Sequence, residues 1–248
     1  DIPKLTYFKN KHMKITLYLI GFLSLCSLHL HAQKDITLAD IWRNGTFQQR
    51  GIQNLNWTPD GQSYLELKAG KIVKTNVQDP SKSEVLFDEK GTKTASGETI
   101  RVQKFSLSSD EKKILIGTAT EAIYRRSSTE TNYIYDRATQ SLKLVSAGGK
   151  QMHASFSPDG KKVGFVRENN LYWVDLATGA EKAITTSGKT NAIIHGVCDW
   201  VYEEEFSFSK AFAWSPDSKK IAFYTFDETQ VPVYNMQMWG DLYPKDYR

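Results

Sequence analysis

The stretch ASFSPDG, at residues 154–160, decides the fold, because the chain contains three further versions of it. These are LNWTPDG at 55–61, FSLSSDE at 105–111 and FAWSPDS at 212–218. In each version an apolar strand ends at a turn, where proline, if present, presets the backbone angle and Asp or Gly supports a tight reversal. A polar or lysine-rich start of another apolar strand follows. Each repeat is therefore predicted to contain a β-hairpin.

The repeats keep a nearly regular spacing along the chain. Their third positions, Trp57, Leu107, Phe156 and Trp214, lie 50, 49 and 58 residues apart. Periods of about 40 to 50 residues with several short strands favour propeller blades over helical solenoids. We therefore predict an all-β fold with about four β-propeller blades. A two-sheet sandwich with similar turns is the alternative.

Two departures from the repeat mark where a site can be built. In each repeat the third strand is expected to end at a polar residue. This residue lies 14 positions after the turn in the first repeat (Asn76) and in the third (Asp175). In the second repeat (Asp136) it lies 24 positions after the turn. This difference predicts a ten-residue insertion within residues 118–131, and the long interval before the fourth turn predicts another of nine residues. Insertions are free to carry function because the regular part of a repeat fold buries the core.

The second insertion contains DWVYEEEF at residues 199–206, where three glutamates follow Asp199, Trp200 and Tyr202. By itself, a run of three glutamates is typical of a solvated surface. Aromatic side chains beside carboxylates instead suggest a site for a small cation. We interpret Cys198 as a half-buried structural thiol rather than a nucleophile, because no base is indicated nearby.

The composition argues against several function classes. The chain has 32 basic and 28 acidic residues, a net charge of +4, and its basic residues are scattered, so we do not predict a nucleic-acid partner. Cys198 is the only cysteine expected in the mature chain, which leaves no disulfide framework or cysteine metal site. The histidines are too dispersed to suggest zinc. No cofactor is predicted.

The amino-terminal residues have the pattern of a targeting segment. Residues 1–12 precede the only convincing start methionine, and we interpret them as an upstream extension outside the fold. Met13 and Lys14 followed by an apolar run at 15–30 are typical of a signal peptide, here residues 13–33, which predicts a secreted or periplasmic protein. A lipoprotein that uses Cys26 is the alternative.

The segment DWVYEEE resembles the double-glutamate motif of the dipeptidyl peptidase IV family, which are prolyl-specific serine exopeptidases. In that family two adjacent glutamates, on a short helical excursion from a β-propeller, hold the protonated amino terminus of a peptide substrate. The resemblance implies this role for Glu204 and Glu205. The family also has an arginine that reaches a substrate carbonyl. When the motif YIYD at 133–136 is used to align the sequences, the resemblance implies this role for Arg125, with the adjacent Arg126 as the alternative.

The resemblance covers nearly all of residues 35–248, including DIW at 40–42 and FDETQVP at 226–232. It implies that residues 34–53 lead into the first blade, with a short helix, and that 54–248 form part of an eight-bladed propeller, truncated before the α/β-hydrolase domain. The chain contains no Gly-x-Ser-x-Gly elbow. No catalytic residue is therefore expected in this chain.

By resemblance, the full-length protein is expected to be a homodimeric serine peptidase that releases Xaa-Pro dipeptides. Its partners would be peptides with a free amino terminus and Pro or Ala at the second position. Membrane anchoring is an alternative to secretion, because animal relatives of this family keep an uncleaved amino-terminal helix. A prolyl tripeptidyl peptidase or related endopeptidase shares the architecture. A noncatalytic periplasmic propeller that binds proteins is the alternative from another class.

Overall fold

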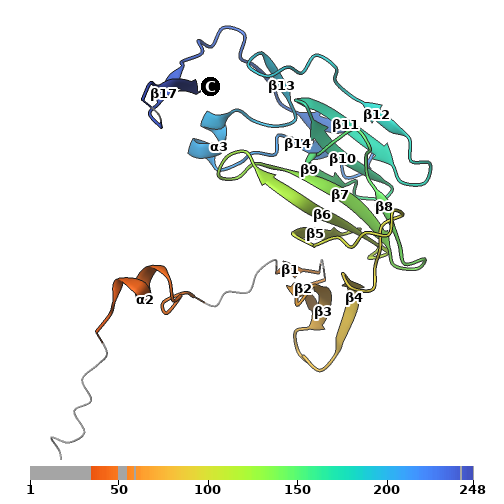
Figure 1. Cartoon of the computed structure of the whole chain (residues 1–248). Coiled ribbons are helices and arrows are strands. Elements are labelled where there is room, and N and C mark those ends of the chain that lie inside the picture. Colours follow the sequence, from red (N-terminus) through yellow and green to blue (C-terminus); the bar gives the residue numbers. More distant parts are fainter. Residues whose placement is uncertain (1–34, 50–54, 59, 241, 248) are drawn as a thin grey trace, which may run out of the picture. The chain divides into compact units, whose positions relative to one another are not determined.

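The computed structural model describes residues 35–49, 55–58, 60–240 and 242–247 (Figure 1). The chain divides into two compact units, residues 1–51 and 52–248. The predicted extension and signal peptide, residues 1–33, lie outside the described residues. Within the described ranges, none of the helices is long and apolar enough to cross a membrane.

The described part of the first unit contains the short helix α2 (Leu38–Trp42). The Thr37 hydroxyl accepts a hydrogen bond from the Asp40 N–H at 3.1 Å, and the Thr37 N–H donates to the Asp40 carboxylate at 3.1 Å. This reciprocal pair is a capping box, which satisfies two N–H groups at the helix start. The short helix predicted around Asp40 is therefore present.

Three four-stranded antiparallel sheets follow one another along the second unit, each with its strands in sequence order (Figure 1). The first sheet contains β1 (Asn56–Trp57), β2 (Ser63–Lys68), β3 (Lys71–Asn76) and β4 (Ser83–Asp88). The second contains β5 (Lys104–Leu107), β6 (Lys113–Ala122), β7 (Ser128–Asp136) and β8 (Ser141–Leu144). The third contains β9 (Met152–Phe156), β10 (Lys162–Arg167), β11 (Asn170–Asp175) and β12 (Glu181–Ala183). These sheets are the blades of the predicted all-β propeller.

The fourth repeat forms the strand pair β14 (Phe212–Trp214) and β15 (Ile221–Phe223). Two strands that flank this pair in the sequence, β13 (Ile193–His195) and β16 (Thr225–Asp227), pair with each other. Further along the chain, β17 (Met236–Met238) pairs with β18 (Lys245–Tyr247). Helix α3 (Trp200–Phe206) lies between β13 and β14 in the sequence. The predicted hairpin is therefore present in the fourth repeat, whose sheet has two strands within the described part of the chain.

The four repeated turns share one hydrogen-bond pattern, which explains why their sequence recurs. In the third turn, the Ser157 hydroxyl donates to Asp159 Oδ1 (2.6 Å) and accepts the Lys162 N–H (2.9 Å). Asp159 Oδ1 also accepts the Lys161 N–H at 3.1 Å. The same bonds form around Thr58 and Asp60, Ser108 and Asp110, and Ser215 and Asp217. The hydroxyl hydrogen bond lowers the pKa of the aspartate in all four turns.

The residue after each turn aspartate has a left-handed backbone, with φ of 66° at Gly61, 55° at Glu111, 66° at Gly160 and 59° at Ser218. Glycine adopts this conformation without steric strain. The two residues that are not glycine contact the preceding blade: Glu111 forms an ion pair with Lys74 (2.6 Å), and the Ser218 hydroxyl accepts the Asp159 N–H (3.0 Å). Side chains at this position therefore join neighbouring blades.

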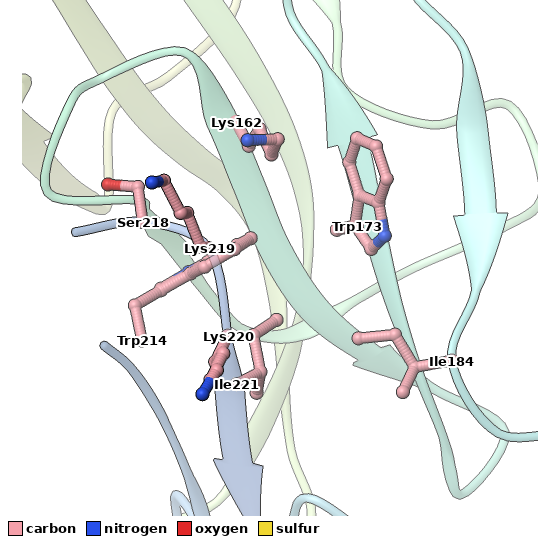
Figure 2. Close-up of a pocket in the computed structure, with 8 residues that line it drawn as sticks. All are labelled: Lys162, Trp173, Ile184, Trp214, Ser218, Lys219, Lys220 and Ile221. Carbon is pink, nitrogen blue, oxygen red and sulfur yellow. The ribbon is translucent and has the colours of Figure 1, made fainter. Parts of the chain in front are cut away.

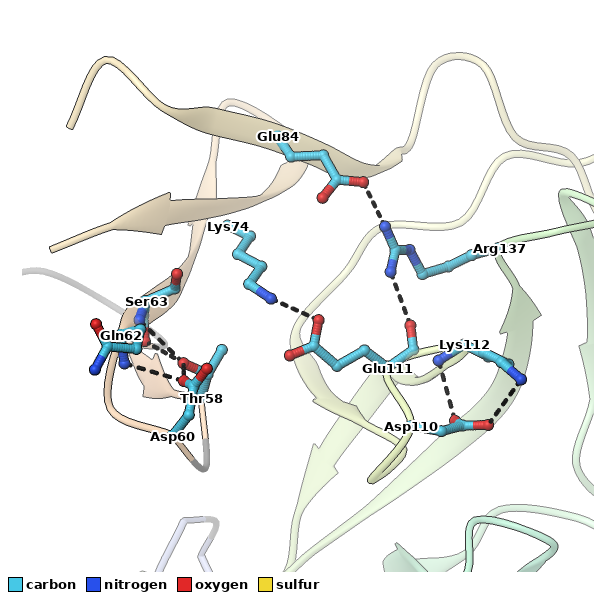
Figure 3. Close-up of polar contacts among 10 residues, drawn as sticks. All are labelled: Thr58, Asp60, Gln62, Ser63, Lys74, Glu84, Asp110, Glu111, Lys112 and Arg137. Carbon is cyan, nitrogen blue, oxygen red and sulfur yellow. Dashed lines mark hydrogen bonds and ion pairs between the residues drawn. The ribbon is translucent and has the colours of Figure 1, made fainter. Parts of the chain in front are cut away.

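Further polar contacts join the first and second blades (Figure 3). Arg137, directly after β7, forms an ion pair with Glu84 of β4 and donates to the Glu111 carbonyl oxygen at 2.9 Å. The two blades are thus held together by Lys74–Glu111 and Glu84–Arg137 pairs at one end of their sheets.

The hydrophobic cores lie between successive sheets, because alternate residues of a strand face opposite neighbours. In β6, Ile114 packs into the core shared with the first sheet, whereas Leu115 packs into the core shared with the third. In β10, Phe165 packs toward the second sheet, whereas Val166 packs with Phe212 of β14. Both faces of the central strands are therefore buried, as blade-on-blade stacking requires.

The predicted insertion in the second blade extends its central hairpin. Strands β6 and β7 contain ten and nine residues, whereas β10 and β11 contain six each. The pairing of β6 with β7 shifts register between Thr118 and Glu121, and residues 123–127, the hairpin tip, connect the two strands. The extension therefore carries Arg125 beyond the end of the regular blade.

Candidate functional site

The second insertion contains helix α3, whose ends are set by local geometry. Asp199 is the N-cap residue, and its Oδ1 accepts the Tyr202 N–H at 2.9 Å. Ser207 ends the helix with a left-handed φ of 63°. Because a helix turns about 100° per residue, its three consecutive glutamates point in three directions.

The exposure of the glutamates follows from these directions. Glu203 is buried, with 2% of its surface exposed. Glu204 is half-buried and Glu205 is exposed. The two glutamates singled out by the resemblance therefore lie on the accessible side of α3, and the first of the run faces the protein.

The two insertions meet at an ion pair. Nη1 of Arg125, in the hairpin tip, lies 3.4 Å from Oε2 of Glu204. The Arg125 side chain is 70% exposed and that of Glu204 is 18% exposed, so the guanidinium remains open to solvent. Glu205 is the next residue of α3, and no ion pair of the described residues involves it. The structure thus brings two of the three predicted site residues into contact, and the third is exposed on the same helix.

A second connection between the insertions runs through Glu203. Its Oε1 accepts the backbone N–H of Arg126 at 2.5 Å and of Ser127 at 2.9 Å. Beyond the end of α3, the Ser209 hydroxyl donates to the Arg126 carbonyl oxygen at 3.3 Å. Arg126, the alternative to Arg125, therefore contributes backbone groups to this contact. The sequence did not single out Glu203, because nothing in a run of identical residues shows which one is buried.

Aromatic side chains pack around Tyr202 on α3. Its ring centroid lies 4.9 Å from that of Phe226, 5.0 Å from Phe206 and 5.8 Å from Phe208. Such tilted and edge-to-face pairs are favourable arrangements of aromatic rings. A seven-residue helix is too short to be stable alone, so this packing holds α3 in place. These rings surround Tyr202, and the placement of aromatic rings against the carboxylates themselves stays a prediction.

Cys198, directly before the N-cap residue, is a structural thiol. Its Sγ donates a hydrogen bond to the Phe208 carbonyl oxygen at 2.7 Å, and burial raises its pKa to about 11. The thiol is therefore protonated at neutral pH, in agreement with the interpretation from the sequence. No group of three or more His, Cys, Asp or Glu side chains in the described part of the chain is arranged to hold a metal ion.

Residues 108–248, which include both insertions, match the family described as "Dipeptidyl peptidase IV (DPP IV) N-terminal region". The chain belongs to the dipeptidyl peptidase IV family. Among solved structures, the chain is similar to Porphyromonas gingivalis dipeptidyl peptidase 4, with a TM-score of 0.79 and 35% identity. That match covers 87% of this chain and 31% of the other.

Two relatives show the same likeness at the level of sequence. Dipeptidyl aminopeptidase B of Saccharomyces cerevisiae is 30% identical over 216 residues, covering 82% of this chain and 26% of the relative. Prolyl endopeptidase FAP of Homo sapiens is 30% identical over 219 residues, covering 87% of this chain and 28% of the relative. The chain therefore spans about a quarter of the length of these relatives. The resemblance to the amino-terminal portion of the dipeptidyl peptidase IV family is confirmed.

A separate hollow of about 410 Å³ lies between the third blade and the β14–β15 pair (Figure 2). Its lining residues are Lys162, Trp173, Ile184, Trp214, Ser218, Lys219, Lys220 and Ile221. Lys162 Nζ lies 5.6 Å from the centroid of the Trp173 ring. Because this lining is basic and apolar and includes no carboxylate, it does not suit a cationic ligand. The candidate site is therefore the junction of the two insertions.

Proposed function

We propose that this region recognises the substrate in a dipeptidyl peptidase that acts on peptides with a free amino terminus and Pro or Ala at the second position. The observation that carries the proposal is the Arg125–Glu204 contact, which joins two separate insertions beside Glu205. A propeller that served only as a scaffold would not need Arg125 and Glu204, from two separate insertions, to lie in contact.

The proposed ligand of Glu204 and Glu205 is the α-ammonium group of the peptide. This group has a pKa of about 8 in water, and nearby carboxylates favour its charged form. A hydrogen bond between charged groups contributes on the order of 1.5 to 3 kcal/mol. Loss of one glutamate should therefore lower affinity about tenfold or more.

Arg125 would bind the peptide from the other side. Its guanidinium carries five N–H donors, so it can keep its contact with Glu204 while it donates to a peptide carbonyl oxygen. With the ammonium and a carbonyl both held, only one peptide bond would reach the nucleophile, which this proposal places outside the chain. Such positioning converts binding energy at a distance into reaction rate.

The proposal is tested by kcat/KM of the full-length protein on an Xaa-Pro chromogenic dipeptide. We expect Glu204→Gln and Glu205→Gln each to lower kcat/KM about tenfold or more. Glu84→Gln is the matched control, because Glu84 also pairs with an arginine but lies in the first blade. Unchanged kcat/KM in both site variants would contradict the proposed amine site. A full-length protein that does not hydrolyse the substrate would support the noncatalytic module.

The same proposal includes export through the signal peptide at residues 13–33 and a homodimeric full-length protein. Both remain predictions, the first from the sequence and the second from the resemblance.

A further inference from the structure

The buried carboxylate of Glu203 is held by the other insertion. Burial of an ionised group is costly unless hydrogen bonds compensate for the lost water. Glu203, 2% exposed, receives two such bonds on one oxygen, from the consecutive N–H groups of Arg126 and Ser127. These donors lie 77 and 76 residues earlier in the chain. Glu203 therefore joins α3 to the hairpin tip rather than stabilising its own helix.

This contact determines the backbone next to Arg125. The N–H of Arg126 belongs to the planar peptide group that also contains the Cα of Arg125. Holding that N–H against Glu203 therefore restrains the position of the Arg125 Cα, from which the side chain extends. The next residue of α3, Glu204, holds the guanidinium of the same arginine at 3.4 Å.

Ser209 holds the opposite side of the same residue. This serine is buried, and its hydroxyl donates to the Arg126 carbonyl oxygen at 3.3 Å. Both backbone groups of Arg126 are thus hydrogen-bonded to the second insertion, the N–H to Glu203 and the C=O to Ser209. The hairpin tip is held by its main chain, independently of its exposed side chains.

We propose that Glu203 is a positioning residue that sets the separation between Arg125 and the carboxylates of Glu204 and Glu205. It does not touch the peptide. This inference rests on the proposed function, because the separation matters only if the two sides bind one substrate. The distance between the ammonium site and the carbonyl site then depends on one buried carboxylate.

The test is a double-mutant cycle in the full-length protein, with kcat/KM on the Xaa-Pro chromogenic dipeptide as the readout. Glu203→Gln retains the size of the side chain and an acceptor oxygen but loses the charge that strengthens both hydrogen bonds. We expect Glu203→Gln to lower kcat/KM about five- to tenfold when Arg125 is present, and less than about twofold in the Arg125→Ala background. If the loss of kcat/KM caused by Glu203→Gln depends on the presence of Arg125, Glu203 acts by positioning Arg125.

The alternative outcomes separate this inference from the proposed function. An equal loss in both backgrounds, with Arg125→Ala itself harmful, would show that Glu203 only stabilises the fold, and would overturn the inference while the proposed function stands. If Arg125→Ala leaves kcat/KM unchanged while Glu204→Gln lowers it, the inference fails and the ammonium site survives. If neither substitution has an effect, both proposals fail.

Ser209→Ala provides the same test if Glu203→Gln does not fold. Removal of the hydroxyl frees only the carbonyl side of Arg126, so we expect a smaller loss of kcat/KM, about two- to threefold, that again disappears in the Arg125→Ala background. An additive effect of Ser209→Ala would overturn the positioning role.

Discussion

Glu203, Glu204 and Glu205 have identical side chains and three different surroundings. The first accepts main-chain N–H groups in a buried place, the second pairs with an arginine, and the third is exposed. The difference arises because one helical turn distributes successive residues around the axis. The second and third are therefore more exposed to solvent than the first, whose carboxylate is hydrogen-bonded to the hairpin tip.

His153 is a half-buried titratable group. It lies in β9 with a left-handed φ of 54°, and its Nε2 is buried without a hydrogen-bond partner among the described residues. Burial, followed by the charges of Lys210 and Lys104, lowers its pKa from 6.5 to about 4. The unfolded chain therefore binds one more proton than the folded chain between about pH 6.5 and pH 4, and stability falls as the pH decreases through this window.

We predict that His153→Asn removes this part of the pH dependence. Asparagine tolerates a left-handed backbone and does not titrate in this range. The wild-type protein should lose about 2 kcal/mol of unfolding free energy between pH 7 and pH 5, and the variant should lose much less. Urea unfolding of the full-length protein at the two pH values measures the difference. An equal loss in both proteins would show that His153 is not responsible.

At the scale of elements, the repeated turn explains how the sequence repeat produces a hairpin in each blade. Its serine or threonine hydroxyl both donates to the aspartate and accepts an N–H from the next strand. The recurring Ser-Pro-Asp-Gly pattern was therefore sufficient to predict each hairpin. What it could not predict is the role of Glu111 and Ser218, because their partners belong to the neighbouring blade and lie far away in sequence.

We predict that Ser157→Ala destabilises the third blade by about 2 kcal/mol, because it leaves the partly buried N–H of Lys162 without the Ser157 hydroxyl as its partner. Ser157 is only 1% exposed, so water cannot easily replace the hydroxyl. Ser215→Ala is the matched control, since Ser215 makes the same bonds in a half-buried turn. We expect a smaller loss there. Equal unfolding midpoints in urea for the two variants would contradict this explanation.

At the scale of the whole molecule, the spacing of the repeats predicted the blades, and the breaks in that spacing predicted both insertions. The site itself was assigned by resemblance, because nothing in residues 118–131 or in the glutamate run indicates that they meet. Their contact depends on the stacking of successive sheets through residues such as Leu115 and Phe165. That packing is a property of tertiary structure and leaves only an alternating apolar pattern in the sequence.

The most direct measurement compares kcat/KM of the full-length protein for one Xaa-Pro substrate with a free amino terminus and for the same substrate acetylated there. Acetylation removes the charge that Glu204 and Glu205 are proposed to bind and leaves the rest of the peptide unchanged. We predict a preference of about 100-fold or more for the free amine, from two charged hydrogen bonds, and only a few-fold in the Glu204→Gln, Glu205→Gln double variant. Equal kcat/KM for the two substrates in the wild-type protein would contradict the proposed amine site.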